Sequence, residues 1–217
     1  MIKIVPTILT DTPASFNQIA EVYQKFAKRI QLDISDGQFS PYPTVALKDI
    51  TFPQGWDGEW DIHLMVKSPS LYIQDILRLH PSLCIFHAES DENLLPLFET
   101  LSQAGIKAGV AVLRSTYPGN IKPYIDACDH VLIFGGTLGR QGGEADMIQL
   151  EKASIIKEID PNVEIGWDGG ANMDNIRAIA HSGIDVINVG GAISRAPDTS
   201  AAYVALQAEI EKTGVNL

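Results

Sequence analysis

Two acidic residues, Asp33 and Asp168, stand where an apolar run of the sequence stops and a glycine-containing turn begins. A histidine, His63, closes a third apolar run that lies between them in the chain. Carboxylate and imidazole groups commonly transfer protons in enzymes, and both also bind divalent metal ions. The three residues therefore predict a site that moves a proton beside a carbonyl group.

Pairs of glycines give a second chemical signal, because they follow apolar runs in the second half of the chain. Glycine lets the backbone approach an anion closely and present consecutive N–H groups to it. We therefore expect a phosphate-binding cradle made by Gly142, Gly143, Gly169, Gly170, Gly190 and Gly191. Arg140 and Arg195 are candidates for adding positive charge there, although each is equally compatible with a solvated surface position.

Short apolar runs alternate along the chain with amphipathic stretches. The runs have the length and the β-branched composition of buried strands. We expect strands at residues 3–5, 29–33, 60–63, 83–87, 108–112, 131–134, 163–165 and 186–189. Between them apolar residues recur every three or four positions, as in helices that pack one face on a sheet. We expect helices at residues 15–26, 70–79, 92–103, 147–159, 172–181 and 199–212.

Strands that alternate with helices predict a parallel sheet covered by right-handed crossovers. Eight such units fit a closed (β/α)8 TIM barrel, and an open doubly wound sheet is the competing α/β architecture. The barrel is preferred because eight evenly spaced strands would make an unusually wide open sheet. No linker or low-complexity segment divides the chain, so we expect a single barrel domain over residues 1–217.

The barrel places the candidate groups on one rim, because the carboxyl ends of its strands carry the ligand-binding loops. Asp33, His63, His87 and Asp168 all lie at or just after the end of an expected strand. Each one alone is also explained by a structural hydrogen bond or a helix cap. Four acidic or imidazole groups on one rim favour a functional site, since burying them without a task is costly.

Composition and charge narrow the class of protein. An apolar fraction of 45% suits a packed globular core, and the net charge of −11 argues against nucleic acid or an anionic membrane as a partner. The sequence has no long uncharged apolar segment and no signal-peptide pattern at its start. We therefore expect a cytoplasmic protein in which Cys84 and Cys128 stay reduced.

Seven short motifs, taken in order, resemble the ribulose-phosphate 3-epimerase family over nearly the whole chain. The His-Leu-Met-Val and Asp-Gly-Gly elements are the more specific ones, although related sugar-phosphate barrels share parts of them. The motifs are residues 5–9 (VPTIL), 32–39 (LDISDGQF), 63–66 (HLMV), 87–89 (HAE), 108–111 (AGVA), 168–170 (DGG) and 190–193 (GGAI).

The resemblance implies a (β/α)8 isomerase that epimerises a phosphorylated ketose, most simply a pentulose 5-phosphate of the pentose phosphate pathway. In it, Asp33 and Asp168 would exchange protons on opposite faces of a sugar carbon. Asp33, His63 and Asp168 would also hold a divalent metal ion (zinc, manganese, magnesium or iron) that stabilises an ene-diolate. The resemblance further implies a homo-oligomer and these substrate-binding residues: Thr7, His63, His87, Gly142, Gly143, Gly169, Gly170, Gly190 and Gly191.

Departures from the family pattern cluster at the expected site. Gln31 stands where the family has a fourth metal ligand, a histidine, and Thr7 replaces a serine. An amide oxygen is a weaker ligand than imidazole, so we expect lower metal affinity and a shift of preference away from zinc, with Gln31 an optional ligand. Trp167 adds a bulky ring beside Asp168.

Three functional hypotheses follow from these patterns. The first is the epimerase. The second is a non-catalytic sugar-phosphate-binding homologue that has kept the barrel but has an impaired metal site. The third, a related barrel lyase or decarboxylase, ranks last because the chain contains no Asp-x-Lys-x-x-Asp pattern.

Overall fold

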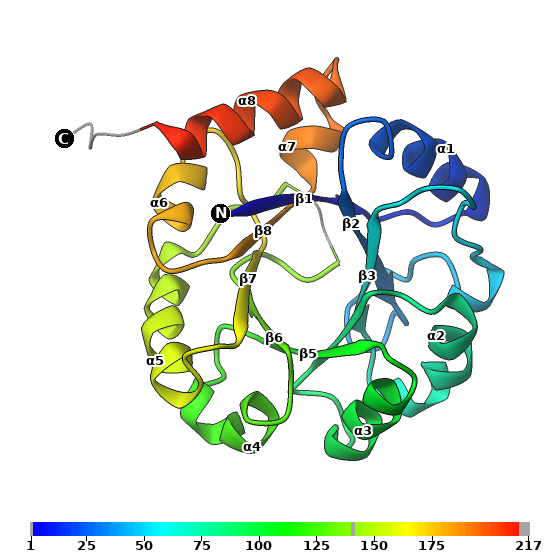
Figure 1. The fold of residues 1–217 in the computed structure, drawn as a ribbon, viewed down its shortest axis with the longest axis vertical. Coiled ribbons are helices and arrows are strands. Elements are labelled where there is room, and N and C mark those ends of the chain that lie inside the picture. The colour runs from blue at the N-terminus through cyan, green and yellow to red at the C-terminus, as the bar shows by residue number, and fades with distance from the viewer. Residues whose placement is uncertain (1, 140–141, 213–217) are drawn as a thin grey trace.

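The chain forms a closed barrel of eight parallel strands in sequential order, and β1 pairs with β8 to close it (Figure 1). The computed structural model describes residues 2–139 and 142–212. Closure confirms the predicted TIM barrel and excludes the open doubly wound sheet. The strands are β1 (Lys3–Ile8), β2 (Arg29–Ser35), β3 (Glu59–Met65), β4 (Leu83–His87), β5 (Lys107–Val112), β6 (His130–Phe134), β7 (Glu164–Asp168) and β8 (Val186–Val189).

Helices surround the barrel and cover the outer face of the strands (Figure 1). The α-helices are α1 (Pro13–Tyr23), α2 (Ile73–Leu79), α3 (Leu95–Gln103), α4 (Lys122–Ile125), α5 (Glu151–Ile159), α6 (Ile176–Ala180), α7 (Gly191–Ser194) and α8 (Thr199–Glu211). Short 3₁₀ helices are η1 (Leu47–Asp49), η2 (Pro69–Tyr72), η3 (Pro118–Ile121) and η4 (Met147–Leu150). Side-chain caps start the first and last α-helices, where Thr12 and Asp198 accept hydrogen bonds from the backbone N–H groups of Ser15 and Ala201.

The expected elements are present, with shifted boundaries. Strand β2 runs two residues beyond its expected end, and β7 begins one residue late and extends to Asp168. The helix expected at residues 172–181 is only α6, because asparagine turns occupy its first part. Helix α4 and helix α7 were not expected, since both are only four residues long and too short to show a helical period.

Charged residues fill the amino-terminal end of the barrel interior. The guanidinium of Arg29 donates a hydrogen bond of 2.7 Å to Asp61 and two bonds of 3.0 and 3.1 Å to Glu164. Nδ1 of His130 lies 2.9 Å from the same Glu164 carboxylate. Although burial disfavours its ionised form, the hydrogen bonds from His130 and Arg29 hold the pKa of Glu164 well below its ordinary value. This basal network agrees with a structural role for His130.

One group of buried apolar residues comes from β4, β5 and β6 alone. It consists of Leu83, Ile85, Ala111 and Leu132, which form a small buried cluster of their own. Most other buried apolar residues belong to a larger cluster that joins the strands to the surrounding helices. Most of the apolar core therefore lies between the strands and the helices that cover them.

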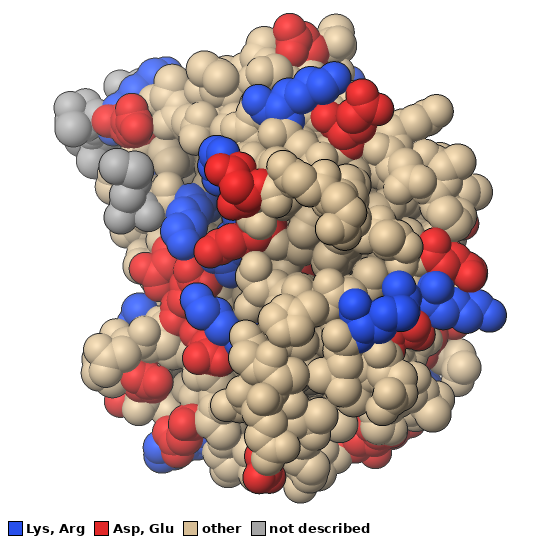
Figure 2. All heavy atoms as spheres, turned by 45° about the vertical axis from the view of Figure 1, so that its right-hand side comes forward, with Lys and Arg blue, Asp and Glu red and all other residues tan. Residues whose placement is uncertain are grey.

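The surface mixes charges of both signs. On the face drawn in Figure 2, Lys and Arg side chains lie beside Asp and Glu side chains and do not gather into one basic area. Both Cys84 and Cys128 are free thiols. Within residues 2–139 and 142–212, no helix is long and apolar enough to cross a membrane.

The basal network predicts an acid-dependent loss of stability. Because the folded state lowers the pKa of Glu164, its stabilising contribution is complete above the ordinary carboxyl value of 4.5 and declines as the pH falls below it. Glu164→Gln should lower the free energy of unfolding at pH 7 by about 2 kcal/mol, between the values for buried and exposed ion pairs. Urea unfolding at pH 7 and pH 3.5 measures the difference from wild type, which should shrink at the lower pH.

The matched control is Glu158→Gln, which makes the same chemical change at an exposed position of α5. It should alter the free energy of unfolding by less than about 0.5 kcal/mol at either pH. A Glu164→Gln difference that stays constant between the two pH values would contradict the role given to this ion pair.

Candidate active site

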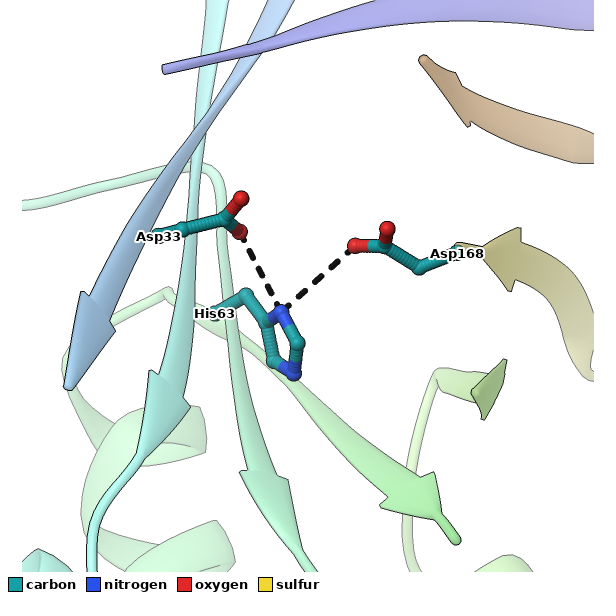
Figure 3. A group of neighbouring side chains, drawn as sticks. All are labelled: Asp33, His63 and Asp168. Atoms are coloured by element: carbon teal, nitrogen blue, oxygen red, sulfur yellow. Dashed lines mark hydrogen bonds and ion pairs between the residues drawn. The ribbon is translucent and has the colours of Figure 1, made fainter. Parts of the chain in front are cut away.

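Three side chains point toward one another at the carboxyl ends of their strands: Asp33 from β2, His63 from β3 and Asp168 from β7 (Figure 3). Nδ1 of His63 lies 3.2 Å from Oδ1 of Asp33 and 3.6 Å from Oδ2 of Asp168. One ligand atom from each residue lies within 4.8 Å of the other two. The structure thus brings together the three residues that the sequence pattern selected.

Strand register explains this convergence. Asp33 and His63 are direct partners across the β2–β3 pair, so their side chains leave the sheet on the same side at the same height. Asp168 is the last residue of β7, which is separated from β2 by β1 and β8 around the barrel. The two carboxylates therefore approach the same point from different sides of the mouth.

Gln31 links the two carboxylates. Its side-chain amide nitrogen donates hydrogen bonds of 2.8 Å to Oδ1 of Asp33 and 2.7 Å to Oδ2 of Asp168. Its amide oxygen is buried and has no hydrogen-bond partner among the described residues. Rotating the amide by 180° would turn this oxygen toward the carboxylates, an arrangement that a bound cation would stabilise.

These donors fit a divalent metal ion. Two carboxylates, one imidazole nitrogen and an available amide oxygen make a mixed oxygen and nitrogen set, which suits manganese, iron, magnesium or zinc. The unpartnered oxygen of Gln31 is a further argument, because a cation would satisfy it. Asp33, His63 and Asp168 are the residues that could hold the ion, and Gln31 is a fourth candidate.

Burial and mutual charge shift the pKa values at this site. Burial, followed by the negative charge of Asp33, raises the pKa of Asp168 well above its ordinary value. For His63, burial acts against the charged ring, but the hydrogen bond and charge of Asp33 outweigh it and raise the pKa. The cluster therefore favours arrangements in which a proton or a cation lies between the carboxylates.

Thr7 and His87 lie next to this cluster. Thr7 is buried on β1 and is the register partner of Gln31. His87 is fully buried behind His63, with the two Nε2 atoms 2.9 Å apart. Its ring also packs against Phe39, and burial lowers the pKa of His87 to about 4. Both residues are therefore within the site's immediate surroundings, and His87 touches His63 directly.

A cavity of about 240 Å³ opens beside the cluster. Asp33, His63 and Asp168 line one part of it. The predicted glycines line the other part, namely Gly142, Gly143, Gly169, Gly170, Gly190 and Gly191. The guanidinium of Arg195 also faces this cavity, whereas Arg140 lies outside the described residues. Acidic groups and glycine turns thus share one cavity.

Close packing against backbone or a buried ring requires glycine at two positions near Asp168. Gly169 has a φ of +111°, and a Cβ there would lie 2.1 Å from the backbone nitrogen of Gly136. A Cβ at Gly135 would lie 2.3 Å from the ring of Trp167. Trp167 itself is fully buried, and its indole N–H donates to the carbonyl of Gly169. The bulky ring therefore supports the turn that follows Asp168 and does not occupy the cavity.

Two other residues at this end of the barrel were not predicted as site residues, although Glu89 belongs to the 87–89 motif. Asn188 on β8 lines the cavity, is the register partner of Asp168, and has a buried amide oxygen without a hydrogen-bond partner in the described part of the chain. The sequence feature that could have identified Asn188 is a polar residue inside an otherwise apolar strand. Glu89 follows β4 and lies 3.4 Å from His87. The sequence feature that could have identified Glu89 is a carboxylate two residues after His87, just beyond the end of a strand.

A family model and similar relatives point to the same protein family. A model of the ribulose-phosphate 3 epimerase family matches residues 3–194. Ribulose-phosphate 3-epimerase of Helicobacter pylori is 27% identical over 214 residues, which cover 94% of this chain and 96% of the relative. The enzyme of the same name from Bacillus subtilis is 28% identical, with coverage of 89% and 92%.

Solved structures with the same architecture include more distant proteins. A 3-hexulose-6-phosphate synthase superposes with a TM-score of 0.74 at 17% identity, covering 96% of this chain and 100% of that one. Orotidine 5'-phosphate decarboxylase of Pyrococcus horikoshii superposes with a TM-score of 0.65 at 16% identity, covering 97% and 100%. At these identities the likeness concerns the barrel fold alone.

The donor set predicts that metal affinity is limited by residue 31. Gln31→His would offer an imidazole nitrogen in place of an amide, so the variant should bind Zn²⁺ or Mn²⁺ at least about tenfold more tightly than wild type. Metal content after dialysis and competition with a chelating dye measure the change.

A suitable control is Gln103→His, which adds an imidazole on the exposed side of α3. That variant should bind metal as wild type does. Equal affinity of Gln31→His and wild type would show that residue 31 lies outside the metal's reach.

Proposed function

The chain belongs to the ribulose-phosphate 3-epimerase family, and we propose that it inverts the configuration at carbon 3 of a phosphorylated ketose, with a pentulose 5-phosphate as the best candidate. The observation that carries this proposal is the pair of carboxylates, Asp33 and Asp168, that reach one point from different sides of the barrel mouth. An epimerisation needs one acid and one base on opposite faces of the same carbon.

The proposed reaction consists of two proton transfers. One aspartate, ionised, removes the proton from carbon 3, and the electron pair of the C–H bond moves toward the carbonyl at carbon 2 to give an ene-diolate. The other aspartate, protonated, gives its proton to carbon 3 from the opposite face. Because the reaction is reversible, Asp33 and Asp168 exchange roles between the two epimers.

Negative charge on the ene-diolate needs stabilisation at the same place. A divalent metal ion (zinc, manganese, magnesium or iron) held by Asp33, His63 and Asp168, with Gln31 as a further ligand, would supply this Lewis-acid stabilisation. The N–H groups of Gln31 already hold the two carboxylates in the facing position. Nδ1 of His63 faces both carboxylates, at 3.2 and 3.6 Å, where it could bind the same ion.

The rest of the cavity suits the phosphate end of the substrate. We assign the phosphate to the turns of Gly142, Gly143, Gly169, Gly170, Gly190 and Gly191, which line the cavity. Backbone N–H groups in such turns hold phosphate without a strongly basic surface, which agrees with a net charge of −11. Arg195 adds a cation at the same end. Thr7 is assigned to the sugar end, while His87 reaches the substrate only through His63.

One observation favours a second candidate, a sugar-phosphate-binding homologue without turnover. The side-chain amide of Gln31 donates a hydrogen bond to each carboxylate, so these two groups have hydrogen-bond partners even without a metal ion. Such a protein would bind a ketose phosphate but exchange no proton. A cytoplasmic location and a homo-oligomeric state remain predictions for either candidate.

Exchange of the carbon-bound proton tests the proposal directly. Ribulose 5-phosphate incubated with the protein and Mn²⁺ in deuterated water should incorporate one deuterium at carbon 3. Asp33→Asn and Asp168→Asn should each lower the exchange rate by about 10²- to 10⁴-fold, because each removes a general acid or base. Proton NMR of the sugar measures the exchange.

The control variant is Asp174→Asn, an exposed aspartate near α6, which should exchange at the wild-type rate. Binding of ribulose 5-phosphate without exchange, by wild type with metal present, would instead support the binding homologue. Neither binding nor exchange with any pentulose or hexulose phosphate would exclude both candidates.

A further inference from the structure

We propose that His87 and Glu89 form a positioning relay behind His63, which keeps Nδ1 of His63 available to a metal ion. Neither residue touches the carboxylates, and each acts through its neighbour. The inference rests on the metal-holding part of the proposed function but not on the identity of the sugar. It concerns a chain of buried groups that leads from the site to the loop after β5.

The relay is continuous. Nδ1 of His63 faces the two aspartates, and its Nε2 lies 2.9 Å from Nε2 of His87. The other ring nitrogen of His87, Nδ1, lies 3.4 Å from Oε2 of Glu89. Within the described residues, these last two atoms are buried and have no other hydrogen-bond partner, so a shift of about 0.5 Å would join them at normal length.

Hydrogen bonding at the far end anchors Glu89. Its Oε1 accepts a bond of 2.9 Å from the backbone N–H of Leu113 and another from the hydroxyl of Thr116. Burial acts to raise the pKa of Glu89, but the nearby ring of His87 and these bonds outweigh it and hold the pKa below its ordinary value. Oε2 of Glu89 is thereby fixed as an acceptor directed at His87.

A fixed acceptor at one end determines which nitrogens carry protons along the relay. Because Oε2 of Glu89 can only accept, His87 carries its proton on Nδ1 and presents a bare Nε2 to His63. The facing Nε2 of His63 must then be the protonated one, since two bare nitrogens would repel each other at 2.9 Å. Nδ1 of His63 is left as the atom that can bind a metal ion between the aspartates.

Glu89→Gln tests the relay because it should exchange the protonated and unprotonated ring nitrogens of both histidines. The N–H of Leu113 requires an acceptor, so the amide oxygen of the new side chain would stay at the Oε1 position and its NH₂ group would face His87. His87 would then accept at Nδ1 and donate from Nε2, which obliges Nε2 of His63 to accept and places the proton of His63 on Nδ1. The variant should bind Mn²⁺ about 10- to 100-fold more weakly than wild type.

Two readouts besides activity decide the question. Two-bond ¹H–¹⁵N correlation spectra report which ring nitrogen of each histidine is protonated. Wild type should show His63 protonated at Nε2 and His87 protonated at Nδ1, and Glu89→Gln should show the reverse. The matched control is Glu92→Gln, a nearby carboxylate bonded to Ser70, which should leave both the spectra and the Mn²⁺ affinity unchanged.

The wild-type spectra keep the inference testable even if the variant does not fold. His87 protonated at Nε2 in wild type would overturn it, as would unchanged Mn²⁺ affinity in a folded Glu89→Gln variant. Both measurements are made without a sugar. Failure of deuterium exchange together with the expected tautomers and metal binding would therefore contradict the proposed reaction and leave the relay standing.

Discussion

Two carboxylates that face each other inside a closed barrel are the constraint on which the site depends. Asp33 and Asp168 are brought together by the register of β2 and by the end of β7, and their like charges repel in a place with little water. The side-chain amide of Gln31 compensates for this repulsion by donating a hydrogen bond to one oxygen of each carboxylate. These two hydrogen bonds explain how a pair of acids can be poised for chemistry without unfolding the barrel mouth.

The barrel separates this pair from a second group of buried charges. At the other end of the interior Arg29 is bound by Asp61 and Glu164, so positive and negative charges compensate each other within hydrogen-bond distance. The paired charges at the base stabilise the fold. The excess negative charge of Asp33 and Asp168 at the mouth instead favours binding a cation or a proton.

Sequence patterns were sufficient for the barrel and for the three convergent residues, because both depend on local periodicity and on strand ends. The closed order of strands and the meeting of Asp33, His63 and Asp168 were predicted correctly. The orientation of the Gln31 amide and the contact between His63 and His87 were not, since they depend on side-chain directions across different strands. The unusual size of Trp167 beside Asp168 was evident from the sequence. Its packing against Gly135 could be seen only in the structure.

A glutamine at position 31 leaves His63 as the one imidazole among the residues at this site that could hold a metal ion. With two imidazoles, a metal site tolerates some disorder in either ring, because the other still supplies a nitrogen. With His63 as the one imidazole among Asp33, His63 and Asp168, the protonation of the wrong ring nitrogen would remove the only nitrogen ligand. The buried connection from His63 through His87 to Glu89 limits this loss by fixing the tautomer, so a site with one weaker ligand depends more strongly on its supporting residues.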